Sequence, residues 1–151
     1  MTFTQKLRSA VASSGSTLCV GLDPNLSLLP KSVKRDLLDP ESQVSFFCKS
    51  VIDHTQDFCA AYKPNLAFFE ALGASGLEIF EEVVQHIPDD KIIIADAKRG
   101  DIGNTSRMYA SAYFKTLDCD AITLSPYMGY DSISPFLEVE GKWAILLALT
   151  S

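Results

Sequence analysis

Five short apolar runs, each followed by polar residues at its carboxyl end, constrain the fold of this chain most strongly. They read TLCVGLD, FCAAYK, KIIIADAK, AITLSP and WAILLALTS, and they begin at positions 17, 58, 91, 121 and 143. Their apolar residues are mostly continuous and do not alternate with polar ones, which is typical of strands buried on both faces of a parallel sheet. The sequence therefore predicts five parallel strands.

Helical patterns precede the first run and fill the interval before the second. Residues 3–11 place four apolar side chains on one helical face, as an opening helix requires. Before the second run, Asp39 is suited to an N-cap and Pro40 to the first helical position. The sequence thus predicts a helix on each side of the first strand.

Helical patterns also fill the later intervals. Ser75 and Glu78 form a capping-box pattern ahead of an apolar helical face, and Pro88 is a closing signal for that helix. Residues 104–117 predict a further helix capped by one of its first two residues, and residues 131–139 predict a shorter one. Strands and helices therefore alternate along the whole chain.

This alternation fits two architectures, the doubly wound sheet and the (β/α)8 barrel. In a barrel the carboxyl ends of all strands converge on one mouth, whereas in a doubly wound sheet only those at the switch point meet. No G-x-G-x-x-G follows the first run, which removes the usual phosphate loop of the doubly wound fold. Polar residues lie at or just beyond the carboxyl end of every run: Asp23, Lys63, Asp96 with Lys98, Ser125, and Thr150 with Ser151. We predict an α/β fold of the (β/α)8 TIM-barrel type.

The length of the chain limits how much of a barrel it can supply. A complete barrel has eight strands and about 250 residues, whereas this sequence has 151 residues and five strand-like runs. We expect residues 1–151 to form one domain, an incomplete barrel made of an N-terminal helix and the first five strands. Such an arc would expose two edges and an apolar inner face. Either the chain is a piece of a longer protein or other segments complete it.

Composition excludes several kinds of partner. The net charge is −6, and we find no basic patch or nucleic-acid motif, so we expect a small-molecule substrate and no nucleic acid. No apolar run approaches the roughly 20 residues of a membrane span, so we expect no membrane partner. The cysteines lack metal-ligand spacing, and we interpret them as free buried thiols of a cytoplasmic protein. They are Cys19, Cys48, Cys59 and Cys119.

Three ionic groups stand out near the strand ends. Alone, Asp96 and Lys98 could belong to a solvated loop with local ion pairs, and Lys63 could be a surface amine. Together they favour a site, because Asp96 and Lys98 are two apart on a strand and point to the same side, which Lys63 can also reach. Alternating charges let each ion stay ionised where isolated burial would cost several kcal/mol.

The stretch IIIADAKRGDIGNT resembles the signature of the orotidine 5′-phosphate decarboxylase family. The family pattern D-x-K-x-x-D-I-x-x-T is met by Asp96, Lys98, Asp101, Ile102 and Thr105. CVGLDPN, AAYKPNLAFFE, TLSPYMG and LLALTS resemble the other strand ends of that family, especially in a bacterial subgroup. The similarity runs from about position 17 to 151, without the family's last third, where its phosphate-binding loop and arginine lie.

The resemblance implies conversion of orotidine 5′-phosphate to uridine 5′-phosphate, the last step of pyrimidine nucleotide synthesis, with no metal or organic cofactor. Loss of carbon dioxide from C6 leaves an unstabilised carbanion, so catalysis must come from charges fixed in advance. By resemblance, Lys98 stabilises that charge and protonates C6, and Asp96 lies beside the departing carboxylate. Lys63 supports the charge network and contacts the ribose.

The resemblance also assigns groups that bind substrate. Asp23 binds a ribose hydroxyl and Ser151 faces the pyrimidine. Asp101 is assigned a catalytic role, and with Ile102 and Thr105 it enters the site of the neighbouring subunit. A homodimer is therefore expected.

Two alternatives remain open at this point. Related barrel enzymes that act on phosphorylated keto-sugars share D-x-K-x-x-D but use magnesium, with an acid where this chain has Lys63; a lysine is a poor metal ligand. The second alternative is an inactive fragment that serves only as an interaction module. We expect residues 1–151 alone to be inactive, because three strands and the phosphate site lie outside them.

Overall fold

Five parallel strands form one sheet in the computed structural model, which describes residues 1–37 and 39–149. Each strand pairs with the next one along the chain, so the order in the sheet is the order in the sequence. The strands are β1 (Cys19–Leu22), β2 (Ala61–Pro64), β3 (Ile92–Arg99), β4 (Ala121–Leu124) and β5 (Trp143–Leu146). The prediction of five parallel strands is confirmed.

The strand order distinguishes the two architectures. A doubly wound sheet reverses its strand order at a switch point, whereas a barrel adds each strand beside the previous one. The order β1-β2-β3-β4-β5 contains no reversal. The sheet is thus the arc of a barrel, as predicted.

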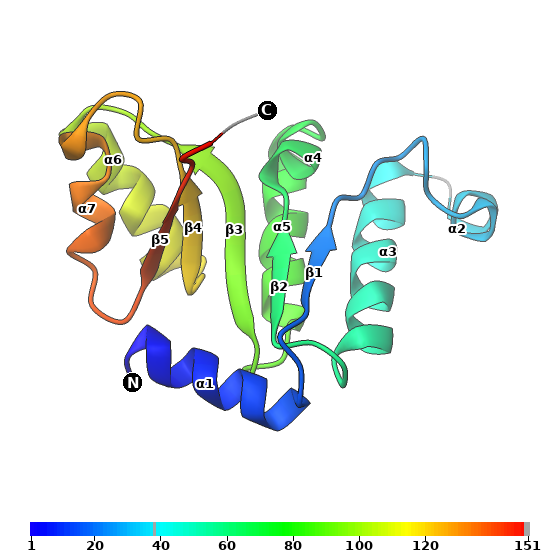
Figure 1. Cartoon of the computed structure of the whole chain (residues 1–151). Helices are drawn as coiled ribbons and strands as arrows, with labels where there is room; N and C mark the ends of the chain where they lie inside the picture. The colour runs from blue at the N-terminus through cyan, green and yellow to red at the C-terminus, as the bar shows by residue number, and fades with distance from the viewer. Residues whose placement is uncertain (38, 150–151) are drawn as a thin grey trace.

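Helices cover the outer side of this arc, and α1 crosses beneath the amino ends of the strands (Figure 1). The helical elements are α1 (Phe3–Ser14), α2 (Lys31–Asp36), α3 (Pro40–Thr55), α4 (Leu66–Glu70), α5 (Ala74–His86), α6 (Gly103–Ser111), the π-helix η1 (Ala112–Thr116), the 3-10 turn η2 (Tyr130–Ser132) and α7 (Ser134–Leu137). No helix in the described parts of the chain has the length and apolar character that crossing a bilayer requires.

The main core lies between the outer face of the sheet and the helices. Buried strand residues such as Tyr62 and Ile122 pack there with Ile52 of α3 and Phe80 of α5. Burying side chains of this size contributes about 1.5–3 kcal/mol each. This outer layer therefore fixes the strands whose carboxyl ends carry the polar residues.

At the amino ends of the strands, α1 is held by one stacked pair and one ion pair. The Phe3 and Trp143 rings stack with centroids 4.3 Å apart. Lys6 donates to both carboxylate oxygens of the buried Asp120, at 2.8 and 2.7 Å, and Asp120 also accepts the Ile93 N–H. The opening helix is confirmed, and it closes the lower end of the arc.

The predicted helix caps give a mixed result. Asp39 caps α3 as expected, because its side chain accepts the Ser42 N–H at 2.7 Å. The capping box at Ser75 is wrong: α5 begins after Gly73, with no side-chain cap, and Ser75 donates instead to Glu41 and to the carbonyl of Leu72. The reason is the unpredicted helix α4, whose exit turn starts α5 before Ser75 is reached.

The start of α6 also differs from the prediction. The helix begins at Gly103 behind Ile102, which is its N-cap and makes no side-chain cap bond, so neither Asn104 nor Thr105 is the cap. The predicted segment 104–117 then continues from α6 into the π-helix η1.

All four cysteines are free thiols, but not all are buried. Cys48, Cys59 and Cys119 are buried, and burial raises the pKa of Cys48 and Cys119 to about 12. Cys19 is exposed, which contradicts the expectation for this residue. It lies on the inner face of β1, beside a groove of about 360 Å³ that Ile94 and Ile145 also line. That inner face is open in an arc of five strands.

Candidate active site

The carboxyl ends of β2 and β3 bring together the ionic groups that the sequence singles out. Asp96 accepts hydrogen bonds from two ammonium groups, from Lys63 Nζ at Oδ2 and from Lys98 Nζ at Oδ1, each at 2.6 Å. The Asp96 side chain is only 8% exposed, whereas Lys63 and Lys98 are 34% and 51% exposed. The predicted alternation of charges is present, with the carboxylate at its centre and the amines toward the mouth.

The two lysines keep Asp96 ionised despite its burial. Burial alone would raise its pKa, but hydrogen bonds from Lys63, Lys98 and Thr123 and the charge of Lys63 lower the pKa of Asp96 to about 2. The carboxylate therefore stays negative at neutral pH. This leaves two ammonium groups fixed within hydrogen-bonding distance of one buried anion.

Thr123 of β4 is a site residue that the sequence reasoning missed. Its hydroxyl donates to Asp96 Oδ1 at 2.9 Å and accepts the backbone N–H groups of Ala97 and Lys98, both at 3.0 Å. A signal was available in AITLSP, since Thr123 interrupts an apolar run two residues before Ser125 and so falls on the same side of the strand. Ser125 is half-buried at the strand end, where its N–H donates to the Arg99 carbonyl.

The backbone at Lys98 is not the regular extended strand that the sequence predicts. Lys98 has a φ of 49°, and the register between β3 and β4 shifts between Ala95 and Arg99. A left-handed residue other than glycine costs on the order of 1–3 kcal/mol and persists where its surroundings fix it. Lys98 thus reaches the predicted side through a bulge, which turns its amine back toward Asp96.

Arg99 anchors the same strand end from the outer side. Its guanidinium pairs with Glu70 of α4 and lies over the rings of Tyr109 and Tyr113, 5.4 and 5.8 Å from their centroids. The Ala97 carbonyl accepts a further bond from Arg99 Nη1 at 3.1 Å. These contacts tie the end of β3 to three outer helical elements, α4, α6 and η1.

Asp23 follows β1 at the same edge of the sheet. Its exposed carboxylate accepts a bond of 3.4 Å from the side-chain amide of Asn65, which follows β2. Asn65 in turn forms a parallel bridge with Asp96. The structure therefore brings Asp23 to the mouth beside the charged cluster, although no ion pair joins them among the described residues.

Asp101, Ile102 and Thr105 lie apart from this cluster. Asp101 Oδ1 accepts the N–H of Ile102 at 2.7 Å, and among the described residues Asp101 forms no ion pair. Ile102 is 56% exposed, and Thr105 is half-buried in the first turn of α6. A side chain at Gly100 would meet the Ser125 carbonyl at 2.4 Å, so the chain leaves β3 in close contact with the end of β4. Thr150 and Ser151 lie outside the described residues.

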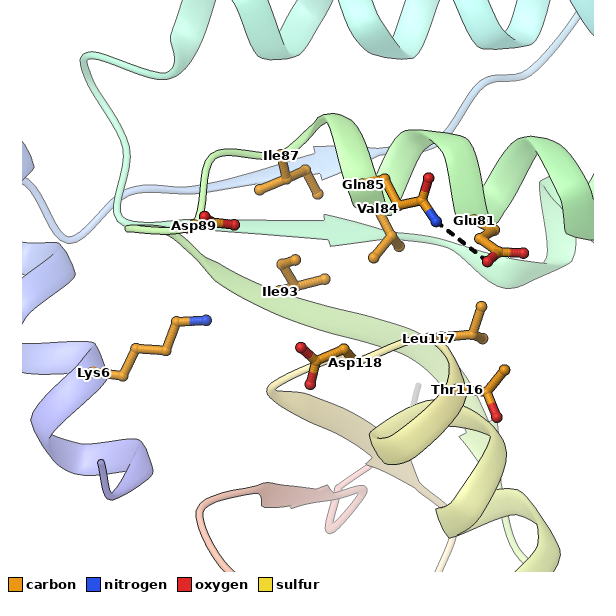
Figure 2. Close-up of a pocket in the computed structure, with 10 residues that line it drawn as sticks. All are labelled: Lys6, Glu81, Val84, Gln85, Ile87, Asp89, Ile93, Thr116, Leu117 and Asp118. Carbon is orange, nitrogen blue, oxygen red and sulfur yellow. Dashed lines mark hydrogen bonds between the residues drawn. The ribbon is translucent and has the colours of Figure 1, made fainter.

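The charged cluster does not lie in the cavity of about 500 Å³ that Figure 2 shows. That cavity lies at the opposite end of the sheet, near the start of β3, with α5 on one side and η1 on the other; Lys6 reaches toward it from α1. The charged cluster instead occupies the open mouth of the arc. No group of three or more potential metal ligands occurs within residues 1–37 and 39–149.

Comparison with known proteins places this geometry in context. A family model described as "Orotidine 5'-phosphate decarboxylase / HUMPS family" matches residues 16–151. The chain is 51% identical over 150 residues to orotidine 5′-phosphate decarboxylase of Bacteroides fragilis strain YCH46, covering 97% of this chain and 53% of that protein. It is 49% identical over 149 residues to the corresponding protein of Herpetosiphon aurantiacus, covering 99% of this chain and 54% of that protein. The chain spans about half the length of the curated relatives it matches.

Solved structures give the same result for the fold. The OMP decarboxylase of Leishmania donovani superimposes with a TM-score of 0.85 and 39% identity, covering 100% of this chain and 55% of that one. The UMP synthase of the same organism gives a TM-score of 0.87 and 40% identity, covering 100% of this chain and 31% of that one. The predicted fold class is confirmed over about half the length of such barrels.

Proposed function

The chain belongs to the orotidine 5′-phosphate decarboxylase / HUMPS family, and from this premise we propose that it carries the charged half of an active site for decarboxylating orotidine 5′-phosphate to uridine 5′-phosphate. The observation that carries the proposal is the row Lys63, Asp96, Lys98, with both carboxylate oxygens bound to ammonium groups at 2.6 Å. The same reaction is supported by the curated relatives named as decarboxylases, whose sequences are 51% and 49% identical to this chain over the matched residues.

The row of charges suits a reaction whose difficulty is an unstabilised carbanion. As carbon dioxide leaves C6, the Lys98 ammonium stabilises the developing negative charge and then donates a proton to that carbon. Lys98 is half-exposed at the mouth, so its amine can reach a bound substrate, while Asp96 behind it keeps the amine in place. Because these charges are oriented before the reaction, little reorganisation is needed when the new charge forms.

The remaining groups of the mouth bind the nucleotide in this proposal. Lys63, on the neighbouring strand β2, contacts the ribose, and Asp23, which follows β1, binds a ribose hydroxyl. The family resemblance assigns Ser151, which lies outside the described residues, to the pyrimidine. By the family resemblance, the phosphate is held by residues beyond the fifth strand, in the part of the relatives that this chain does not cover.

The active site is shared between two subunits in this proposal. Asp101, Ile102 and Thr105 lie on the loop and helix that leave β3, and Ile102 is more than half exposed. The Asp101 carboxylate has no ion-pair partner among the described residues of its own chain. A second copy related by a two-fold axis would receive these residues in its site and donate its own in return.

A magnesium-dependent reaction on a sugar phosphate is the second candidate, because the D-x-K-x-x-D pattern formed by Asp96, Lys98 and Asp101 resembles that of such barrel enzymes as well. Both oxygens of Asp96 are already bound by ammonium groups. A cation at this carboxylate would have to displace Lys63 or Lys98 and accept repulsion from the other. The charge arrangement therefore favours decarboxylation without a metal.

The test uses a completed chain, in which residues 1–151 are continued by the C-terminal part of the Bacteroides fragilis relative. We expect it to convert orotidine 5′-phosphate to uridine 5′-phosphate, measured by chromatography, at the same rate with and without excess EDTA. Activity that EDTA abolishes and magnesium restores would favour the sugar-phosphate group. A folded completed chain with no decarboxylase activity would contradict the proposal and leave the interaction module as the better account.

A further inference from the structure

The hydroxyl of Thr123 has all of its hydrogen-bonding capacity used at the base of the charged cluster. It accepts the N–H groups of Ala97 and Lys98, both at 3.0 Å. Those two groups can only donate, so the single hydroxyl proton is free to go to Asp96 Oδ1, 2.9 Å away. Thr123 is 7% exposed, which leaves little room for water to replace any of these three bonds.

The two N–H groups belong to the part of β3 where the sheet is irregular. In a regular parallel ladder such groups bond to carbonyls of the adjacent strand. Here the register with β4 shifts between Ala95 and Arg99, and a side-chain oxygen of β4 takes the place of a carbonyl. Thr123 thus holds the bulge in which Lys98 adopts its left-handed backbone conformation.

One hydroxyl therefore links the backbone beneath Lys98 to the carboxylate that Lys98 contacts. Asp96 Oδ1 accepts both the Lys98 ammonium, at 2.6 Å, and the Thr123 hydroxyl. Lys63 binds the other oxygen of the same carboxylate. If the hydroxyl were lost, the bulge and the carboxylate could move independently, and the Lys98 amine would no longer be held in one position.

We propose that Thr123 is a positioning residue for the reaction, which sets Lys98 and Asp96 relative to the reacting carbon without itself touching the substrate. The inference rests on the proposed function, because it names the group that holds the proposed catalytic lysine. It adds Thr123 of β4 to the charged cluster. This residue belongs neither to the polar residues predicted at the strand ends nor to the family signature.

The experiment compares Thr123→Val with Thr123→Ser in the completed chain. Valine has nearly the shape of threonine but no hydroxyl, whereas serine keeps the hydroxyl. We expect Thr123→Val to lower kcat by roughly 10²-fold with little change in KM, as a displaced catalytic group does. Thr123→Ser should retain most of the activity.

Thr55→Val is the matched control. Thr55 also uses its hydroxyl in two partly buried bonds, to the Val51 carbonyl at 2.6 Å and to the Tyr62 hydroxyl at 2.7 Å, but it lies between α3 and β2 on the outer side of the sheet. Its loss should lower the melting temperature and leave kcat unchanged. This comparison separates a general loss of stability from a loss of position.

Hydrogen exchange of the Ala97 and Lys98 amides supplies a readout that does not depend on the reaction. We expect slow exchange in the wild type, Thr123→Ser and Thr55→Val, and fast exchange in Thr123→Val. Wild-type kcat in Thr123→Val, a loss that serine does not rescue, or unchanged amide protection would overturn the inference. If the wild-type completed chain is inactive, the proposed function fails. Fast amide exchange in Thr123→Val would then show that the hydroxyl holds the bulge but has no catalytic consequence. That outcome also rejects the positioning role.

Discussion

A single buried carboxylate organises the candidate site. Asp96 binds two ammonium groups and one hydroxyl, and these contacts keep it ionised although its side chain is 8% exposed. Burying such a carboxylate without any partner would be costly, whereas this set of partners satisfies both of its oxygens. The sequence predicted the two lysines because they lie at strand ends in alternation with Asp96. It did not predict Thr123, since one threonine in an apolar strand is ordinarily a packing residue.

The low pKa of Asp96 leads to a prediction about stability at acid pH. Because the pKa of Asp96 falls from its usual value of 3.8 to about 2 on folding, ionised Asp96 stabilises the fold above about pH 4, and that contribution is lost as the pH falls through about 2. The shift corresponds to about 2 kcal/mol.

In urea unfolding of the completed chain, the stability advantage of the wild type over Asp96→Asn should shrink as the pH falls from 5 to 2.5. An advantage that stays constant over this range would show that the Asp96 carboxylate does not titrate with a lowered pKa. Glu82→Gln is the control. Lys49 lowers the pKa of the Glu82 carboxyl too, but this pair is exposed, so the difference in unfolding free energy between the wild type and Glu82→Gln should change less over the same pH range than for Asp96→Asn.

At the scale of single elements, β3 could be predicted in position but not in shape. The apolar run from Ile92 and the charges after it located the strand and the site. The bulge at Lys98 could not be predicted, because it depends on a hydrogen bond that the Lys98 N–H donates to Thr123 of β4, which is distant in sequence. The start of α5 could not be predicted either. Ser75 fits the sequence pattern of a capping box, but the turn that follows α4 starts the helix before Ser75. Local signals such as the Asp39 cap succeed where no neighbouring element competes.

The segment that leaves β3 carries a prediction about the shared site. If Asp101 enters the partner's site, each site combines Lys98 of one subunit with Asp101 of the other. Mixing two inactive completed chains, Lys98→Ala and Asp101→Ala, then gives heterodimers with one intact site and one doubly damaged site. With random exchange, half of the dimers are mixed and half of their sites work, so roughly a quarter of wild-type activity should return.

The control for this mixing experiment is a direct measurement of subunit exchange. Native mass spectrometry of the mixed variants shows what fraction of the dimers contains one subunit of each. If exchange is complete and no activity returns, Asp101 acts within its own chain and the trans assignment is wrong. Mixing Lys98→Ala with Asp96→Asn, which damage the same half-site, should restore nothing in either case.

At the scale of the whole molecule, the five strands form an arc whose inner face is open. Five strands in chain order expose an inner face with the Cys19 thiol and with Ile145, which is 37% exposed. The relatives are about twice as long, and the part of them that this chain does not cover is available to complete such a barrel. The polar groups at every strand end made this architecture predictable, because they required one common mouth, and the unbroken order of the strands confirms it. The exposure of Cys19 was not predictable, since an apolar run does not say which of its faces remains uncovered.

The central claim is that the charges fixed at the end of β3 perform decarboxylation, and the turnover number of Lys98→Ala in the completed chain tests it most directly. We predict that kcat for orotidine 5′-phosphate falls by at least about 10³-fold, because the substitution removes the preorganised positive charge at the reacting carbon. The melting temperature should change little, since Lys98 is half-exposed and Asp96 keeps its bonds from Lys63 and Thr123. A decrease in kcat of less than about tenfold in a folded protein would contradict the account, because Lys98 would then only balance the charge of Asp96.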